Sequence, residues 1–121
     1  MQDFCRMNNY RKLIVWEKAM ALVDRVYSNT DFIPGDERFG FKSQLTRASV
    51  SIPANIAEGA GRNNQNEYRH FLGIALGSAY EVETLLLIGI RRKWINAEGQ
   101  QILELVSEVQ KILQAIIKKL Y

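Results

Sequence analysis

The sequence predicts an all-α protein, an antiparallel up-down-up-down four-helix bundle formed by one domain over residues 1–121. Apolar residues recur at three- and four-residue steps along the chain, and no segment shows the sustained alternation typical of a strand. Turn-forming residues at Pro34-Gly35 and at 59–61 divide the chain into long helical segments. Because the connections are short, neighbouring helices are expected to run in opposite directions.

The first helix is predicted over residues 15–28, where apolar side chains recur on one face. These are Trp16, Ala19, Met20, Val23 and Tyr27. The turn dipeptide Pro34-Gly35 lies in the segment that ends this helix. Residues 1–12, which precede it, are expected to form a flexible N-terminal segment.

The second helix is expected to begin near Asp36, because Asp36 and Glu37 are favourable in a first turn. Pro53 lies inside this helix and removes one backbone donor, which predicts a kink. The glycines at 59–61 are expected to end it in a left-handed C-cap. A polar row runs along the helix beside the apolar face: Gln44, Arg47, Ser51, Asn55 and Glu58.

The third helix is predicted from Asn64 to about Arg92, because Asn64 and Glu67 have the spacing of a capping box. The fourth is predicted to be capped by Asn96 and to end near Leu120. Its apolar residues alternate in steps of four and three, as in a bundle seam: Ile102, Val106, Val109, Leu113, Ile116 and Leu120.

The last two helices carry more apolar surface than a monomeric bundle needs. A helix in such a bundle requires an apolar arc of somewhat over 100°, whereas both helices exceed it. The remaining side of the third helix carries Gly73, Gly77, Tyr80 and Thr84. Glycine inside a helix costs about 1 kcal/mol relative to alanine, so this pair indicates the close approach of another backbone. The alternatives are tight packing within the monomer and, as we expect, an interface in a cyclic homo-oligomer.

Five stretches resemble the four-helix bundle proteins encoded in 23S rRNA intervening sequences. They are LIVWEKA at 13–19, GFKSQLTRA at 40–48, SIPANIAEG at 51–59, FLGIALGS at 71–78 and EVET at 81–84. The resemblance implies a bundle that assembles into a ring, usually a pentamer, with no established enzymatic activity. A related branch serves diversity-generating retroelements as an accessory protein that contacts a reverse transcriptase and RNA.

The formal net charge of +3 and the isoelectric point near 9.1 make the chain mildly basic, far below a dedicated nucleic-acid arm. Cys5 is the one cysteine and forms no internal disulfide, and the first residues lack an apolar signal region. We therefore expect a cytoplasmic protein. No run approaches about 18 uninterrupted apolar residues, so no membrane span is expected.

The predicted topology gathers basic residues at one end of the bundle. They are Arg11, Lys12, Lys18, Arg62, Arg69, Lys118 and Lys119, opposed by Glu17, Glu58 and Glu67, and all of these cations except Lys18 are expected to contact phosphates. One interpretation is that the cations at helix C-termini complement the helix dipoles. The other is that in a ring this end forms a basic rim that holds the phosphates of RNA or DNA without sequence preference.

The polar row of the second helix has two interpretations as well. Its members are expected to bond across to Ser78, Glu81 or Glu83 on the third helix, in a structural network that fixes register, since buried charges need partners. The alternative is a ligand site. Glu58 and Arg62 also have the spacing of a favourable ion pair along one helix.

No catalytic, cofactor or metal site is predicted. Glu67 and His70 have the spacing of a di-iron half site, but His70 is the one histidine, so one chain cannot complete the site. Arg62 and His70 are separated by more residues than in small RNA-cleaving bundles of the HEPN type. No cofactor is therefore expected.

These observations predict a non-enzymatic, ring-forming scaffold or adaptor that contacts RNA or DNA through its basic rim. The first alternative is a purely protein-binding assembly whose partner is encoded nearby, such as a reverse transcriptase. A small metal-dependent enzyme or ribonuclease is a further alternative.

Overall fold

The computed structural model describes residues 9–120. Within them the chain forms four α-helices and two short 3-10 helices, with no strand, so the predicted all-α fold with four long helices is confirmed. The elements in order are η1 (Tyr10–Lys12), α2 (Ile14–Tyr27), η2 (Gly35–Glu37), α3 (Phe41–Ala60), α4 (Gln65–Arg91) and α5 (Gly99–Lys119). Part of the segment predicted to be flexible, residues 10–12, forms η1; residues 1–8 lie outside the described residues.

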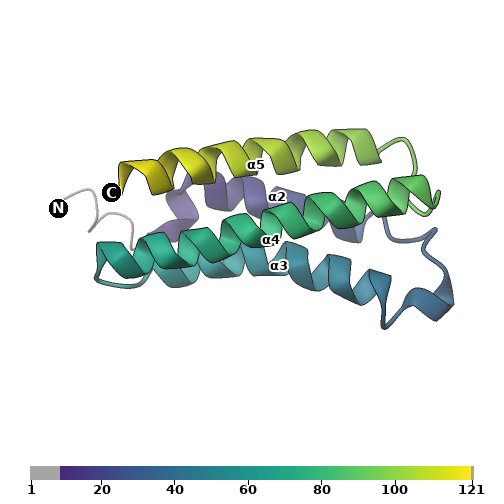
Figure 1. The fold of residues 1–121 in the computed structure, drawn as a ribbon, viewed down its shortest axis with the longest axis horizontal. Helices are drawn as coiled ribbons and strands as arrows, with labels where there is room; N and C mark the ends of the chain where they lie inside the picture. The colour runs from purple at the N-terminus through teal and green to yellow at the C-terminus, as the bar shows by residue number, and fades with distance from the viewer. Residues whose placement is uncertain (1–8, 121) are drawn as a thin grey trace.

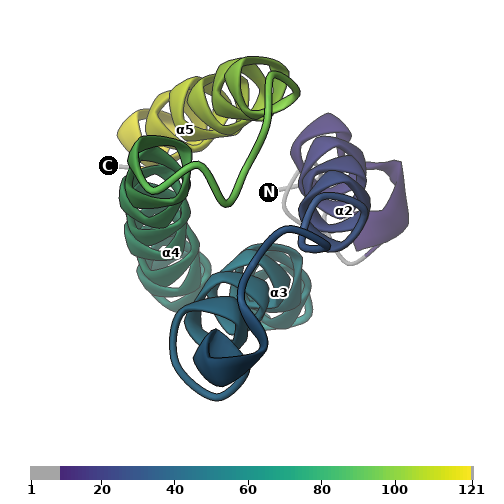
Figure 2. The same ribbon diagram turned by 90° about the vertical axis from the view of Figure 1, so that its right-hand side faces the viewer.

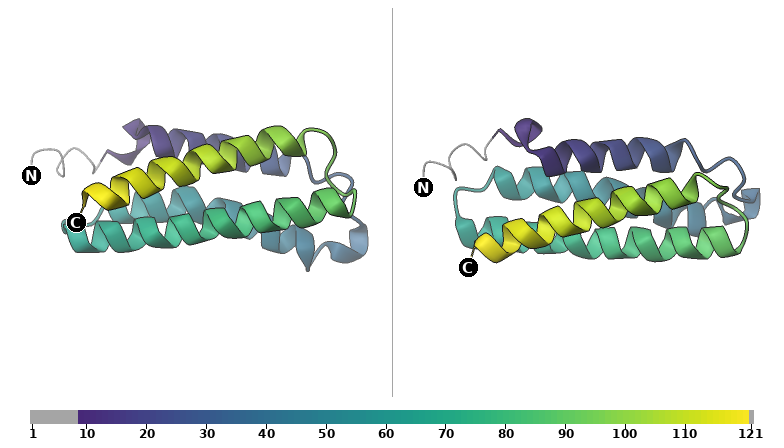
Figure 3. Two further views of the ribbon diagram at one scale, coloured as in Figure 1. Left: turned by 45° about the horizontal axis from the view of Figure 1, so that its top comes forward. Right: turned by 90° about the horizontal axis from the view of Figure 1, so that it is seen from above.

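The four α-helices lie side by side around one core (Figure 1). Viewed along the helices, they follow one another around the core in the order α2, α3, α4, α5 (Figure 2). The α3–α4 connection lies at one end, together with the start of α2 and the end of α5 (Figures 1 and 3). We call this the rim end. The α2–α3 and α4–α5 connections lie at the other end, which we call the loop end.

Every α-helix contributes side chains to the core. The largest that are fully buried include Leu22 of α2, Leu45, Ile52 and Ile56 of α3, Tyr68, Leu72 and Leu86 of α4, and Ile102 and Leu113 of α5. Full burial of one such aliphatic side chain contributes about 1.5–3 kcal/mol. The inward face of α2 is made by Val15, Ala19, Leu22 and Val26, so the face predicted through Trp16, Met20, Val23 and Tyr27 is wrong. Met20 and Tyr27 are 39% and 53% exposed, because a parallel row of apolar residues, one position earlier and with the same three- and four-residue steps, packs on the core instead.

Helix α3 begins at Phe41, so the predicted start near Asp36 is wrong. Asp36 and Glu37 lie in η2, and Gly40 separates η2 from α3 with a non-helical backbone, φ −99° and ψ −103°. The backbone N–H of Phe41 donates to Oε1 of Glu37 at 3.2 Å. The acidic residue thus stabilises the start of the helix from outside it.

The predicted left-handed glycine C-cap of α3 is also wrong. Gly61 has φ −77°, in the right-handed region, and no described glycine has a positive φ. Gly59 is buried inside the helix, where an added Cβ would lie 2.8 Å from the Cβ of Phe71. The glycine at 59 therefore allows α3 and α4 to approach closely.

A left-handed residue does occur at the end of α4, where Lys93 has φ 64°. The N–H of Trp94 donates to the carbonyl of Gly89 at 2.9 Å, and the N–H of Lys93 donates to that of Ile90 at 3.0 Å. This pair of bonds is the Schellman motif, in which glycine is the usual left-handed residue.

The predicted asparagine caps are present in two forms. Oδ1 of Asn64 accepts the N–H of Glu67 at 3.1 Å, which caps α4 as predicted. Oδ1 of Asn96 accepts the N–H of Glu98 at 3.0 Å in the turn before α5. The N-cap of α5 is Glu98, two residues later than predicted.

Helix α4 is long and apolar enough to cross a membrane by length and composition, and no other described helix is. A third of its most apolar window is buried in the bundle. A core helix of a soluble protein passes the same test.

Candidate nucleic-acid interface

The rim end brings together basic residues that are far apart in sequence. Arg11 and Lys12 belong to η1, Arg62 and Arg69 flank the start of α4, and Lys118 and Lys119 end α5 (Figure 1). All are exposed except Arg69, which is half-buried. The predicted set is thus gathered at one end of the molecule.

Arg62 differs from the others because carboxylates offset its charge. Its guanidinium lies 2.8 Å from Oε2 of Glu58, the ion pair predicted from their spacing, and 3.6 Å from Oε1 of Glu67. The same group lies over the ring of Phe71, 5.1 Å from its centroid. Arg62 therefore contributes less to an anion site than its position in the sequence indicates.

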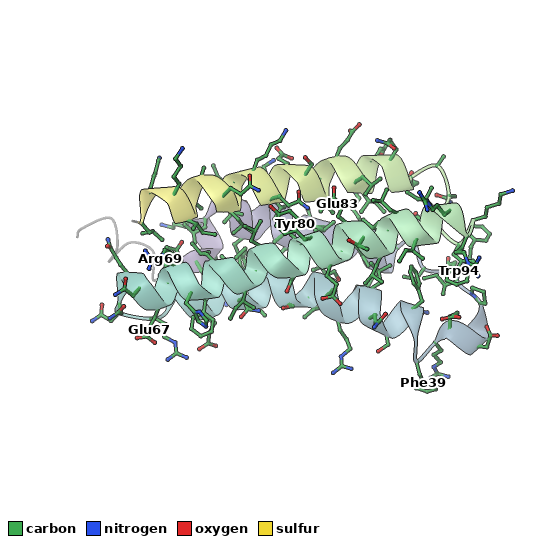
Figure 4. All side chains as sticks on the ribbon, in the orientation of Figure 1. Phe39, Glu67, Arg69, Tyr80, Glu83 and Trp94 are labelled. Carbon is green, nitrogen blue, oxygen red and sulfur yellow. The ribbon has the colours of Figure 1, made fainter. Side chains whose placement is uncertain are left out.

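Four other cations at the rim end differ from Arg62 in this respect. Among the described residues, no carboxylate lies within ion-pair distance of Arg11, Lys12, Lys118 or Lys119. Arg11 lies 6.0 Å from the ring centroid of Tyr10. These four side chains form the positive surface that a phosphate backbone can meet; Figure 4 shows Arg69 and Glu67 at the same end.

The outer side of α4 is not covered by its own chain. Gly73, Gly77, Tyr80 and Thr84 are exposed, and nothing lies within 4 Å of a Cβ added at either glycine. The interpretation of these glycines as tight packing within the monomer is therefore wrong. The hydroxyl of Tyr80 accepts from Nε2 of Gln114 at 2.6 Å, and Oγ1 of Thr84 donates to the carbonyl of Tyr80 at 2.9 Å.

Large apolar side chains extend the same surface along α4. Ile74, Leu87 and Ile88 are 40%, 47% and 42% exposed. The extra apolar residues predicted on the last helix are not exposed in this way. They are partly buried and pack against the core: Leu103, Leu105, Ile112, Ile116 and Ile117. The apolar surface that the chain itself leaves uncovered is therefore on α4 and not on α5.

Part of the polar row of α3 bonds to α4 as predicted. The hydroxyls of Ser51 and Ser78 lie 2.8 Å apart, and Nδ2 of Asn55 donates to the carbonyl of Ser51 at 2.8 Å and to its hydroxyl at 3.0 Å. An open hollow of about 280 Å³ lies beside these residues. It is lined by Gln44, Arg47, Ala48, Ser51, Ser78 and Glu81.

Glu83 does not belong to this row, so its predicted place is wrong. Its Oε1 accepts from Nε2 of Gln110 on α5 at 3.1 Å, and the same nitrogen lies 3.5 Å from the carbonyl of Ala79 (Figure 4). Gln110 is buried and was not predicted. The sequence offered one indication of its burial, since Gln110 directly follows the core residue Val109 on the inward side of the helix.

No metal cluster is formed by the residues that the structure describes, since no three His, Cys, Asp or Glu side chains gather in the range 9–120. His70 is exposed, and its ring lies edge-on to Phe71 with centroids 5.6 Å apart. Among the titratable groups of α4, burial raises the pKa of the Tyr68 phenol above its ordinary value of 10.0.

Comparison with known proteins agrees with the helical arrangement. The model of the 23S rRNA-intervening sequence protein family matches residues 11–115. A crystal structure from Bacteroides thetaiotaomicron, of a protein with unknown function from the S23 ribosomal protein family, is 30% identical, with a TM-score of 0.79. The similarity covers 87% of this chain and 99% of that one. No curated protein shows significant similarity to the chain. The family match runs from η1 into α5, and the chain therefore belongs to the 23S rRNA-intervening sequence protein family.

Proposed function

We propose that this protein is a non-enzymatic cytoplasmic scaffold that assembles into a ring of its own copies and holds RNA or DNA through the rim end. The observation that carries this proposal is the set of four exposed cations, Arg11, Lys12, Lys118 and Lys119, which the fold gathers at one end and none of which forms an ion pair with a carboxylate of the described residues. Such a set attracts phosphates by charge alone and confers no sequence preference.

The outer side of α4 supports the assembly. Gly73 and Gly77 leave room for a second backbone, and Ile74, Leu87 and Ile88 offer apolar area beside them. A second copy fits this surface better than lipid, because the exposed Glu81 also lies near the middle of α4. Burial against that copy would remove the exposed apolar area from water.

A ring would multiply the weak charge of one rim end. The alternation of the connections between the two ends in Figure 1 supports the up-down-up-down course. Cyclic symmetry then places the rim ends of all copies on the same face. With five copies, the number that the family resemblance implies, the four cations repeat around one circle and bind phosphates jointly.

Nucleic-acid binding is tested by fluorescence anisotropy with labelled duplex DNA and RNA at low salt. Lys118→Glu should weaken binding, whereas Lys111→Glu, an exposed lysine on the same helix outside the cation set, should have little effect. Affinity should also fall as salt rises. If Lys118→Glu binds as tightly as the unchanged protein, the rim has no such role.

Assembly is tested by light scattering at micromolar concentration. The expected result is a multiple of the chain mass of 13.9 kDa, and a single copy would overturn the ring. The α4 surface also fits a helix of another protein. Stoichiometric capture of one protein without nucleic acid would therefore favour the protein-binding assembly over the nucleic-acid scaffold.

A further inference from the structure

We infer that the loop end carries a second, separate site, at which Phe39 stacks against an unpaired base of single-stranded nucleic acid. The guanidinium groups of Arg38 and Arg92 and the ammonium group of Lys93 bind the flanking phosphates. The inference rests on the proposed function only in taking nucleic acid as the partner. Its residues lie at the opposite end of the bundle from the rim cations (Figures 1 and 4).

Phe39 is the most exposed large apolar residue that the structure describes. Its exposed fraction is 87%, so almost all of the side chain is in water. The guanidinium of Arg38 lies 5.3 Å from its ring centroid. Two residues later, Phe41 is buried, which anchors the segment to the core. Phe41 therefore fixes the segment on the core, and the ring of Phe39 projects into solvent with the Arg38 guanidinium beside it.

A second aromatic residue with a cation lies at the same end. Trp94 is half-buried and meets the ring of Phe41 edge-on, with centroids 5.1 Å apart. The guanidinium of Arg92 lies 5.8 Å from the centroid of Trp94. Phe41 thus connects the segment that bears Phe39 with the α4–α5 connection, and both connections present cations and an aromatic ring.

Lys93, which lies between Arg92 and Trp94 in the sequence, adds a positive charge, and its backbone has an unfavourable conformation. Its φ of 64° is in the left-handed region, where glycine is the usual residue. A side chain that is kept in a strained position is more common at functional sites than elsewhere. The strain is therefore consistent with a use for the ammonium group at this position.

Carboxylates also lie at the loop end, namely Asp31, Asp36, Glu37 and Glu98, but none of them forms an ion pair with these cations among the described residues. Oε2 of Glu98 lies 4.0 Å from Arg25, and Oε1 of Glu37 accepts the N–H of Phe41. Within residues 9–120, no ion pair joins a carboxylate to Arg38, Arg92 or Lys93. The three positive charges are thus available to an anion.

Phe32 is a second exposed phenylalanine at this end, with an exposed fraction of 68%. Among the described residues no cation lies over its ring, whereas the Arg38 guanidinium lies 5.3 Å from the ring centroid of Phe39. We therefore place Phe32 outside the site, and it provides a matched control.

The combination of an exposed aromatic face and guanidinium groups matches the two parts of a nucleotide. Bases stack on aromatic rings whatever their sequence, and arginine binds phosphate through a planar set of donors. A base inside a duplex is already stacked and does not reach such a ring, whereas an unpaired base does. The site therefore selects single strands.

The test is fluorescence anisotropy with a labelled oligo(dT) of about 15 nucleotides and a duplex of the same length. Phe39→Ala should weaken single-strand binding about tenfold and leave duplex binding unchanged, since stacking serves only unpaired bases. Phe39→Trp should retain binding, and Phe32→Ala should match the unchanged protein. Circular dichroism checks that each variant is folded.

Several results would overturn the inference. These are no binding of oligo(dT) by the unchanged protein, no loss in Phe39→Ala, or an equal loss for single strand and duplex. A changed mass in light scattering with unchanged oligo(dT) affinity would assign Phe39 to a contact between copies. Loss of binding to phosphatidylserine vesicles alone would assign it to a lipid surface. If Lys118→Glu has no effect but Phe39→Ala loses oligo(dT), the rim proposal fails and this inference stands.

Discussion

Gly59 of α3 and Phe71 of α4 lie so close together that a Cβ on Gly59 would be 2.8 Å from the Cβ of Phe71. The same added atom would lie 3.1 Å from Cδ1 of Tyr68 and 3.2 Å from its carbonyl oxygen. Real Cβ atoms do not come within 3.0 Å of such neighbours. The absence of a side chain at Gly59 therefore sets the distance between the two helices at the rim end.

Gly59→Ala should destabilise the protein. Overpacking of a filled core costs about 1–3 kcal/mol, which exceeds the gain of about 1 kcal/mol in helix propensity when the backbone has to shift. Urea unfolding followed by circular dichroism measures the change. Gly61→Ala is the matched control, because its Cβ would meet the nearest atom at 3.5 Å. Equal stability of the two variants would contradict the packing role of Gly59.

Gly73→Ala and Gly77→Ala should have opposite effects on one chain and on the assembly. In the chain alone each should stabilise α4 by about 1 kcal/mol, because an added Cβ meets nothing within 4 Å. In the assembly the added methyl groups should weaken the contact with the second copy. Light scattering and thermal unfolding at several concentrations separate the two effects. Unchanged assembly would exclude these glycines from the interface.

Glu83→Ala should lower the free energy of unfolding by about 1 kcal/mol, because Nε2 of the buried Gln110 loses its partner at 3.1 Å. A double-mutant cycle with Gln110→Ala should give a coupling of about 0.5–1.5 kcal/mol. Glu81→Ala, at an exposed position two residues away, should have almost no effect. A coupling near zero would show that the bond contributes nothing to stability.

The stability of the protein should fall above pH 10 in part through Tyr68. Burial raises the pKa of its phenol above 10.0, so the folded state keeps the proton that the unfolded chain releases. The stability present below pH 10.0 is therefore lost as pH rises toward the folded pKa, by up to about 1.4 kcal/mol per pH unit.

Tyr68→Phe should reduce this alkaline loss, because it removes the titrating proton. Urea unfolding at pH values from about 8 to about 11 measures the slope for each variant. Tyr27→Phe, at a position 53% exposed, serves as the control and should keep the slope of the unchanged protein. An identical slope in Tyr68→Phe would assign the alkaline loss to other groups.

Lys93→Gly should stabilise the protein by up to about 1 kcal/mol, because glycine adopts φ 64° without steric cost. The same substitution should weaken oligo(dT) binding if the ammonium group meets a phosphate. Thermal unfolding and anisotropy on one sample measure both effects. Lower stability in Lys93→Gly would show that the lysine side chain contributes packing that outweighs the strain.

The apolar period predicted the bounds of α2, α4 and α5 closely, because each has one face that must be buried. It did not predict the inward face of α2, where two rows of apolar residues, offset by one position, share the same period. The start of α3 was harder to predict, since acidic residues stabilise a 3-10 turn and an α-helical first turn alike. The backbone of Gly40 decides between them, and glycine adopts too many conformations for its φ and ψ to be predicted.

The helix that each face contacts was also hard to predict. Glu81 and Glu83 lie about 200° apart around α4, so at most one of them can face α3. Which one does so depends on whether the helices follow one another clockwise or anticlockwise around the core, and the helical period is the same in both cases. The sequence also did not predict the exposure of Phe39, since an aromatic residue near the start of an apolar helix is as compatible with burial in the core as with exposure.

The two tryptophans lie at opposite ends of the bundle. Trp16 packs edge-on to Tyr10 beside the rim cations, with centroids 5.3 Å apart, and Trp94 packs on Phe41 at the loop end. Each indole is consequently an intrinsic reporter of local melting. With the other replaced by phenylalanine, identical emission transitions would mean that the bundle unfolds as one cooperative unit, and separate transitions would reveal which end frays first.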